Sequence, residues 1–106
     1  MRIYIAGPMT GIKDSNYPAF HAAAASLRAL GFAVHNPAEN PVPACGSWLG
    51  YMRMSLRQIA DTDGIVMLPG WADSRGALIE HKLACDLGMP VIDFDKLEQL
   101  VSSSAA

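Results

Sequence analysis

The chain has 106 residues, of which 51% are hydrophobic and 17% are charged. This length fits one core, so we expect a single domain over residues 1–106, with a frayed tail from about residue 102. A formal net charge of −2 argues against a nucleic-acid duplex as partner, because phosphate binding requires a basic face. The low charged fraction also favours a homo-oligomer in which part of the surface is covered.

The first half of the chain contains two predicted strands and one predicted helix. Residues 3–6 form an unbroken apolar run, typical of a buried strand, and the sequence GPMTG follows it as a turn. Helical spacing over residues 15–31 predicts a helix that Ser15 or Asn16 caps and a glycine ends. Its inward face is predicted to consist of Phe20, Ala24, Leu27 and Leu30. Residues 32–34 predict the second strand, and a Pro-rich loop follows it.

The second half continues the same alternation. Apolar residues recur at helical spacing from Trp48 to Ile59, which predicts a second helix ending near residue 60. The elements predicted after it are a strand over residues 65–68, a helix over 74–87, a strand over 91–94 and a final helix over 95–103 that Asp95 caps. No apolar run approaches the length of a membrane span, and the N-terminus does not resemble a signal peptide. We therefore expect a cytoplasmic protein that does not contact a membrane.

This alternation of strands and helices predicts an α/β fold. Nearly continuous apolar strands are typical of a parallel sheet buried on both faces. We therefore expect a three-layer, flavodoxin-like parallel sheet of four or five strands, with helices on both faces. In such sheets ligands bind beyond the carboxyl ends of the strands, at the topological switch point. The loops GPMTG and PGWADSRG, which follow the first and third strands, are predicted to meet there.

Short motifs exclude several common ligands of this fold. The chain has neither the GxGxxG of dinucleotide-binding domains nor the GxxxxGK[ST] of a P-loop. The acidic residues of a receiver domain and the Ser/Thr-rich phosphate loop of a flavodoxin are also missing after the predicted strands. Cys45 and Cys85 lie far apart and the three histidines have no ligand spacing, which favours free thiols and no metal site.

Three segments together carry a family resemblance: IYIAGPMTG, DGIVMLPGW and SRGALIEHKLACDLGMPVI. Between Ile3 and Ile92 the chain resembles the nucleoside 2-deoxyribosyltransferase-like superfamily, and most of all a small, poorly characterised branch from bacteria and phages. The resemblance implies that a glutamate attacks the anomeric carbon of a nucleoside or nucleotide, which releases the base and forms a glycosyl-enzyme ester. Water or a second base then resolves this ester, and no metal or organic cofactor takes part.

The resemblance also assigns roles by position. Glu80 matches the nucleophile, and Tyr4 matches the tyrosine that orients it. Asp73 and Asp61 are candidates for the acid that assists the departing base. The residues assigned to the sugar, the base or the 5′ group are Gly7, Pro8, Met9, Ser74 and Gly76. From the residues alone, Arg75 and the free N–H groups at the helix start could hold a 5′-hydroxyl or a phosphate.

General chemistry supports the same role for a carboxylate. Cleavage of an N-glycosidic bond passes through an oxocarbenium-like state, which negative charge beneath the sugar stabilises. A structural alternative exists at each position: Glu80 could reach solvent, Tyr4 could be a core residue and Asp73 could cap the helix. Trp71 and Trp48 could each stack on a base, although for Trp48 packing in the apolar stripe of its helix is the favoured prediction.

The sequence therefore predicts cleavage or exchange of the N-glycosidic bond of a nucleoside or nucleotide through a glutamate nucleophile. The alternative is a non-catalytic nucleotide sensor or regulatory module on the same fold. Both hypotheses predict a nucleoside or nucleotide as the small-molecule partner, and they differ in whether turnover occurs.

Overall fold

Strands and helices alternate along the part of the chain that the computed structural model describes, residues 1–41, 43 and 46–98. The strands are β1 (Arg2–Ala6), β2 (Ala33–His35), β3 (Gly64–Met67) and β4 (Val91–Asp93). The longer helices are α1 (Tyr17–Ala29), α2 (Trp48–Ala60) and α3 (Arg75–Asp86), and the 3-10 helices are η1 (Lys13–Asn16), η2 (Pro37–Glu39) and η3 (Trp71–Asp73). Residues 94–98 are helical as well, and the rest of the predicted final helix lies outside the described residues. Every strand and helix predicted before it is present, with bounds that differ by at most two residues at either end.

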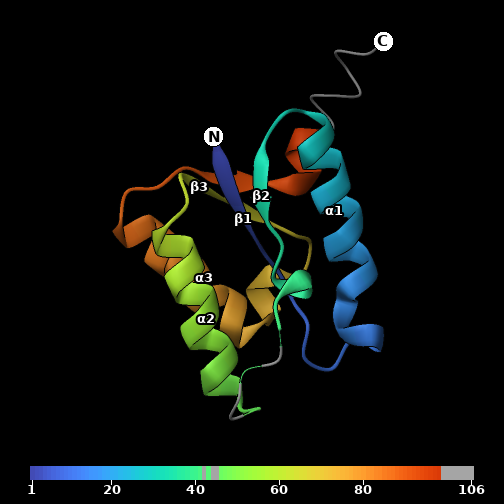
Figure 1. Ribbon diagram of the computed structural model, residues 1–106, viewed down its shortest axis with the longest axis vertical. Helices are drawn as coiled ribbons and strands as arrows, with labels where there is room; N and C mark the ends of the chain where they lie inside the picture. Colours follow the sequence, from blue (N-terminus) through green and yellow to red (C-terminus); the bar gives the residue numbers. More distant parts are fainter. Residues whose placement is uncertain (42, 44–45, 99–106) are drawn as a thin grey trace.

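The four described strands form one parallel sheet in the order β2-β1-β3-β4. Helix α1 covers one face of this sheet, while α2 and α3 cover the other (Figure 1). The predicted α/β fold, a three-layer flavodoxin-like arrangement, is therefore confirmed. The chain passes from β1 outward to β2 and then returns to β3 on the other side of β1, so the switch point lies between β1 and β3.

Alternate residues of β1 face the two helical layers. Ile3 and Ile5 pack against α1 in one core. Tyr4 and Ala6 point the other way, into a second core formed with α2 and α3. Burial on both faces explains the unbroken apolar run of this strand. Leu30, predicted on the inward face of α1, is 47% exposed because it is the C-cap residue, beyond the last residue of the helix.

The loops that follow β1 and β3 touch each other at the carboxyl ends of the strands. A Cβ atom on Gly7 would lie 2.8 Å from the Cβ of Leu68, closer than two such atoms approach in practice. Gly70 has a φ of +83°, and a Cβ there would lie 3.4 Å from Cγ of Pro8. Glycine at these two positions therefore allows the two loops to meet at the switch point, where folds of this class bind ligands.

Two helix starts are capped by residues other than those considered from the sequence. At α3 the Oγ of Ser74 accepts a hydrogen bond from the N–H of Ala77 at 3.3 Å, so Asp73 is not the cap. At the final helical stretch the carboxylate of Asp93 accepts a hydrogen bond from the N–H of Asp95 at 3.1 Å, and Asp95 is itself helical. Each cap lies one or two residues from the expected one, because a short side chain just outside the helix is placed to reach its free N–H groups.

The start of α1 has an unusual backbone instead of a side-chain cap. Asp14, Ser15 and Asn16 have φ angles of 54°, 54° and 60°, which residues other than glycine seldom adopt. Asn16 occupies the N-cap position without a capping bond, and its Nδ2 donates to the carbonyl oxygen of Pro8 at 3.0 Å. The predicted N-cap position at Asn16 is therefore confirmed, but its side chain does not cap the helix, and the Asn16 amide instead joins α1 to the loop after β1.

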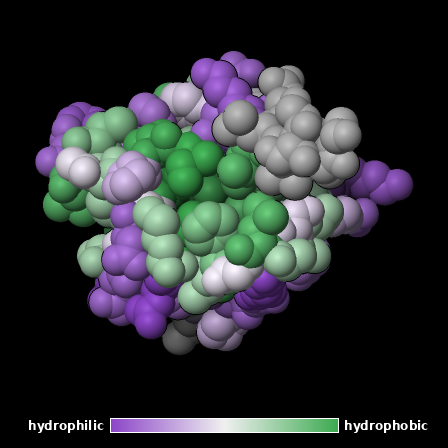
Figure 2. Space-filling model, turned by 90° about the horizontal axis from the view of Figure 1, so that it is seen from above, coloured by the Kyte–Doolittle hydropathy of each residue, from purple (hydrophilic) through white to green (hydrophobic). Residues whose placement is uncertain are grey.

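The end of the molecule at which the strands begin carries an exposed apolar patch. Hydrophobic residues gather at the centre of this face (Figure 2). Met1, Leu30 and Val91, on segments that precede or begin strands, are 57%, 47% and 38% exposed. This patch lies at the opposite end of the strands from the meeting loops. None of the described helices has both the length and the apolar character needed to cross a membrane.

Candidate active site

A buried pair of side chains, Tyr4 on β1 and Glu80 on α3, lies at the switch point. The Tyr4 hydroxyl donates a hydrogen bond to Oε2 of Glu80 at 2.6 Å. The two residues are 1% and 6% exposed, so the alternative in which Glu80 reaches bulk solvent is wrong. Glu80 shares the inward face of α3 with Ala77 and Ala84, whose small side chains leave space near the carboxyl group.

Burial controls the protonation of both members of this pair. It raises the pKa of Glu80 from 4.5 to about 7, and the hydroxyls of Tyr4 and Ser55 oppose this rise only in part. Burial, followed by the neighbouring Glu80 carboxylate, raises the pKa of Tyr4 well above its usual value. Tyr4 therefore stays protonated and donates, while Glu80 is divided between its acid and carboxylate forms near neutral pH.

The two oxygens of the Glu80 carboxyl group have different surroundings. Oε2 accepts the bond from Tyr4. The Ser55 hydroxyl, which lowers the pKa of this carboxyl group, donates its own bond to the carbonyl oxygen of Met52 in this structure. Oε1 has no hydrogen bond to the described residues. Since none of their buried side-chain oxygens lacks a partner, Oε1 must be exposed to the space beside it. One oxygen is thus fixed, and the other is free to contact a ligand.

That space is a cleft of ≈ 980 Å³ at the carboxyl ends of β1 and β3. Its volume falls within the range of small-molecule sites. Nine of the ten residues predicted for the site line it: Tyr4, Gly7, Pro8, Met9, Asp73, Ser74, Arg75, Gly76 and Glu80. Residues from α2 and the start of α1 that also line it include Asn16, Tyr17, Trp48, Tyr51, Met52 and Ser55.

Of the two tryptophans considered for stacking on a base, the structure places Trp48 at the cleft and Trp71 outside it. Trp71 lies outside the cleft, where its indole stacks on His81 with ring centroids 4.3 Å apart and planes at 20°. Trp48, predicted to pack in the core, lines the cleft and is 41% exposed. As the first residue of α2 it meets the start of α3, at Arg75 and Gly76, instead of the sheet. Trp48 is therefore the tryptophan that a ligand in the cleft would contact.

The start of α3 presents backbone donors to the cleft. The N–H of Ala77 is bonded to Oγ of Ser74. The N–H groups of Arg75 and Gly76 belong to the same first turn, where an α-helix provides no main-chain acceptor. A Cβ on Gly76 would lie 3.3 Å from Sδ of Met52, so glycine at this position lets α2 and α3 approach closely. Because Arg75 and Gly76 line the cleft, their N–H groups are available to a ligand there.

Few charged side chains line the cleft. Among the described residues that form its walls, Arg75 is the only arginine or lysine, and Asp73 and Glu80 are the only acids. The guanidinium of Arg75 lies over the Trp48 ring, 4.5 Å from the ring centroid. No group of three or more residues able to hold a metal ion occurs among the described histidines, cysteines and acids. The cleft therefore combines one cation with two carboxyl groups.

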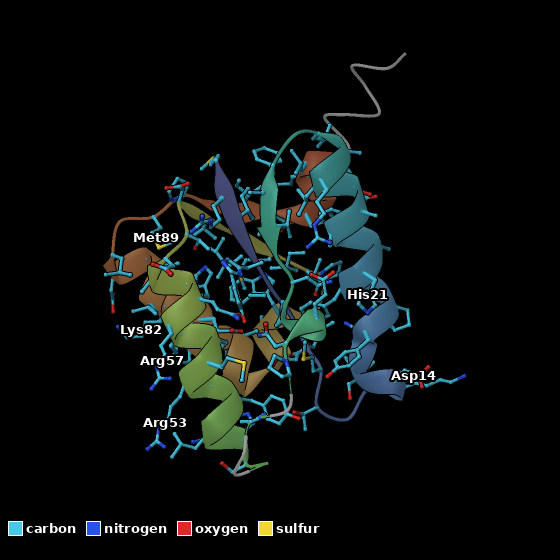
Figure 3. All side chains as sticks on the ribbon, in the orientation of Figure 1. Asp14, His21, Arg53, Arg57, Lys82 and Met89 are labelled. Carbon is cyan, nitrogen blue, oxygen red and sulfur yellow. The ribbon has the colours of Figure 1, made fainter. Side chains whose placement is uncertain are left out.

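Other charged residues of α2 lie away from the cleft. Arg53 and Arg57 project from α2 on the side remote from the sheet (Figure 3). Asp61, a candidate for assisting the departing base, is the C-cap residue of α2 and comes just before β3 begins. It therefore lies at the end of the sheet opposite the cleft, and Asp73 is the remaining candidate.

Ser55 is a residue of the cleft that the sequence analysis did not predict. It lies on α2 and is 6% exposed. Against the larger effect of burial, hydrogen bonding to its hydroxyl lowers the pKa of Glu80 and of Tyr4. The signal in the sequence was a serine three residues after Met52 and four before Ile59, on the inward side of an apolar helix.

Comparison with known proteins shows that most of the chain, including the cleft, matches a protein family. The chain matches a family model described as "Domain of unknown function (DUF4406)" over residues 1–93. The chain belongs to the DUF4406 family. The DUF4406 match begins before β1 and ends with β4, so it includes every residue that lines the cleft. A comparison with curated proteins gives no match.

Proposed function

We propose that this protein cleaves or exchanges the N-glycosidic bond of a nucleoside or nucleotide, with Glu80 as the nucleophile. The observation that carries the proposal is the Tyr4–Glu80 hydrogen bond of 2.6 Å beside a cleft of ligand size. This bond fixes one carboxylate oxygen and leaves the other open. The resemblance to nucleoside 2-deoxyribosyltransferase-like proteins supports the same roles for both residues.

The proposed reaction has two steps at the anomeric carbon of the sugar. Oε1 of the Glu80 carboxylate attacks this carbon, and the bond to the base breaks with its electron pair leaving on the base nitrogen. That nitrogen takes up a proton, for which Asp73 is the acid in the wall of the cleft. Attack by water or a second base on the same carbon then breaks the ester. The proton of the attacking group passes to Asp73, and the Glu80 carboxylate is restored.

Other groups of the cleft suit the rest of a nucleoside. The free N–H groups of Arg75 and Gly76 can hold the sugar or its 5′ group. The rings of Trp48 and Tyr51 line the cleft and offer flat surfaces to a base. Because two acids and one arginine line the cleft, we expect a neutral nucleoside to bind more tightly than its monophosphate.

A 2′-fluoro nucleoside analogue tests the proposal, because slow breakdown of its ester allows the intermediate to accumulate. Mass spectrometry of the intact protein should show one added glycosyl group that maps to Glu80. Glu80→Gln should give no adduct. Glu39→Gln, at an exposed glutamate outside the cleft, should give the same adduct as the wild type. Absence of an adduct with every nucleoside and nucleotide analogue would contradict the proposal.

Binding without turnover would instead support the alternative function. The protein is incubated with deoxynucleosides and their monophosphates, and free base is measured by chromatography alongside thermal unfolding. The proposal predicts base release that Glu80→Ala abolishes. A ligand that raises the melting temperature equally in the wild type and Glu80→Ala, without base release, would indicate a nucleotide sensor or regulatory module.

We also propose that the protein is a cytoplasmic homo-oligomer. The charged fraction of 17% is low, and the apolar patch at the start of the strands is suited to a second copy of the chain. Cys85 is a free, exposed thiol, as expected in a reducing compartment, while Cys45 lies outside the described residues. Analytical ultracentrifugation tests this proposal, and a monomer at every concentration would contradict it.

A further inference from the structure

Ser55 lines the same cleft as the Tyr4–Glu80 pair, and the proposed reaction gives it no function. It lies on the cleft side of α2 and is 6% exposed. Its Oγ donates a hydrogen bond to the carbonyl oxygen of Met52 at 3.1 Å. Serine hydroxyls commonly bond to the preceding turn of their own helix, so this bond alone does not explain a hydroxyl that faces a cleft.

Three elements of the fold face one another here, because Ser55 shares the buried face of α2 with Ile59, which packs in one core with Tyr4. Tyr4 comes from β1, Glu80 from α3 and Ser55 from α2, and all three line the cleft. A hydroxyl has one proton to donate and two lone pairs to accept. Rotation about its C–O bond can turn the Ser55 proton from the Met52 carbonyl towards the ionised carboxyl group. The carbonyl keeps its main-chain partner in the helix after this rotation.

We infer that Ser55 is a positioning residue, whose hydroxyl supplies a second hydrogen bond that holds the Glu80 carboxylate beside Tyr4 with its free oxygen towards the cleft. This inference rests on the proposed function only in naming Glu80 as the reacting group. Burial raises the pKa of Glu80, and the hydroxyls of Tyr4 and Ser55 lower it. Without the Ser55 hydroxyl the carboxyl group would keep its proton to higher pH, and a protonated carboxyl group is a poor nucleophile.

Other titratable groups of the cleft do not take over this role. Burial, Tyr4 and Ser55 set the pKa of Glu80. The remaining titratable residues that line the described cleft are Tyr17, Tyr51, Asp73 and Arg75, and they do not enter this balance. A change at Ser55 should therefore appear directly in the titration of Glu80.

Titration of Glu80 in the free protein tests the inference without any substrate. Carbon-13 NMR of protein labelled at the glutamate carboxyl groups follows the Glu80 signal through pH, and Glu80→Gln identifies that signal by its loss. In Ser55→Ala the pKa should rise above the wild-type value of about 7, and the ratio of carboxylate to acid at neutral pH should fall roughly tenfold. Ser55→Thr keeps a hydroxyl and should restore the wild-type titration.

Thr62 provides a matched control for the loss of a buried hydroxyl. Its Oγ1 donates to the carbonyl oxygen of Ile59 at 2.8 Å, three residues back, as Ser55 does to Met52. It follows the end of α2 that is remote from the cleft, so Thr62→Val should lower stability without changing the Glu80 titration. An unchanged Glu80 pKa in folded Ser55→Ala would overturn the inference. A raised pKa without any glycosyl adduct in the wild type would uphold it and reject the proposed function.

Discussion

Replacement of Glu80 by glutamine isolates the energetic cost of burying this carboxyl group. Its pKa is about 7 in the folded chain and 4.5 ordinarily, so between these values the folded chain holds a proton that the unfolded chain has released. The contribution to stability is therefore complete below pH 4.5 and is lost as pH rises through about 7. The difference in pKa corresponds to about 3 kcal/mol. Glutamine does not titrate, so the variant avoids this loss.

Urea unfolding of the wild type and Glu80→Gln across pH measures the effect. Between about pH 4 and about pH 8, the variant should gain about 3 kcal/mol in free energy of unfolding relative to the wild type. Glu39→Gln is a control in which the free energy of unfolding should change with pH in the opposite direction. The hydrogen bond from Arg28 lowers the pKa of Glu39, so the wild type gains this ion pair as pH rises and the variant does not. A difference between Glu80→Gln and wild type that is constant with pH would refute the burial of an ionisable carboxyl group.

Three further variants test neighbouring features. Tyr4→Phe removes a hydrogen bond that lowers the pKa of Glu80, so the pH of half-maximal base release should move upward. An unchanged pH profile would exclude Tyr4 as the orienting residue. Gly7→Ala places a methyl group 2.8 Å from the Cβ of Leu68 and should lower the free energy of unfolding in urea by about 1–3 kcal/mol; wild-type stability would mean that the two loops do not touch. Nucleoside binding should quench tryptophan fluorescence in the wild type and much less in Trp48→Phe, because Trp48 lines the cleft; equal quenching would place the ligand elsewhere.

The order of strands and helices was predictable because hydrophobic spacing reports burial directly. Residues 3–6 are apolar at every position since both faces of β1 are covered, whereas α1 repeats at helical spacing since one side of it is covered. The ends of elements were less predictable. Leu30 continues the apolar spacing of α1 and is nevertheless exposed, because periodicity does not show where a helix stops contacting the sheet.

The candidate site was predictable from local patterns only where its residues follow strands. Gly7 and Ser74 lie in loops at the carboxyl ends of parallel strands, so topology alone brings them to one edge. The contact between Tyr4 and Glu80 joins residues 76 positions apart, and the family resemblance predicted it where no local spacing could. Ser55 gave too weak a signal, because a single serine in a helix does not reveal which side chains face it from other elements.

The two tryptophans show that helical spacing of apolar residues does not reveal which elements a given side chain contacts. Trp48 extends the apolar side of α2, yet at the first residue of the helix that side meets the start of α3. Trp71 lies in a loop, where no periodic spacing predicts its contacts. Its stacking partner, His81, lies on a helix whose sequence spacing shows only how its side chains are directed relative to Glu80. His81 points about 100° away from Glu80 around that helix, which is the side on which Trp71 packs.

The cleft is assembled from segments that are distant in the chain. Tyr4, Ser55 and Glu80 belong to three different elements, so a chain that has not folded completely lacks the site. A ligand of the cleft therefore binds the native state alone. At about a hundred times its dissociation constant, such a ligand adds about 2.7 kcal/mol to the free energy of unfolding. The cellular concentration of that ligand would then influence how long the protein survives proteolysis, whether or not the protein converts the ligand.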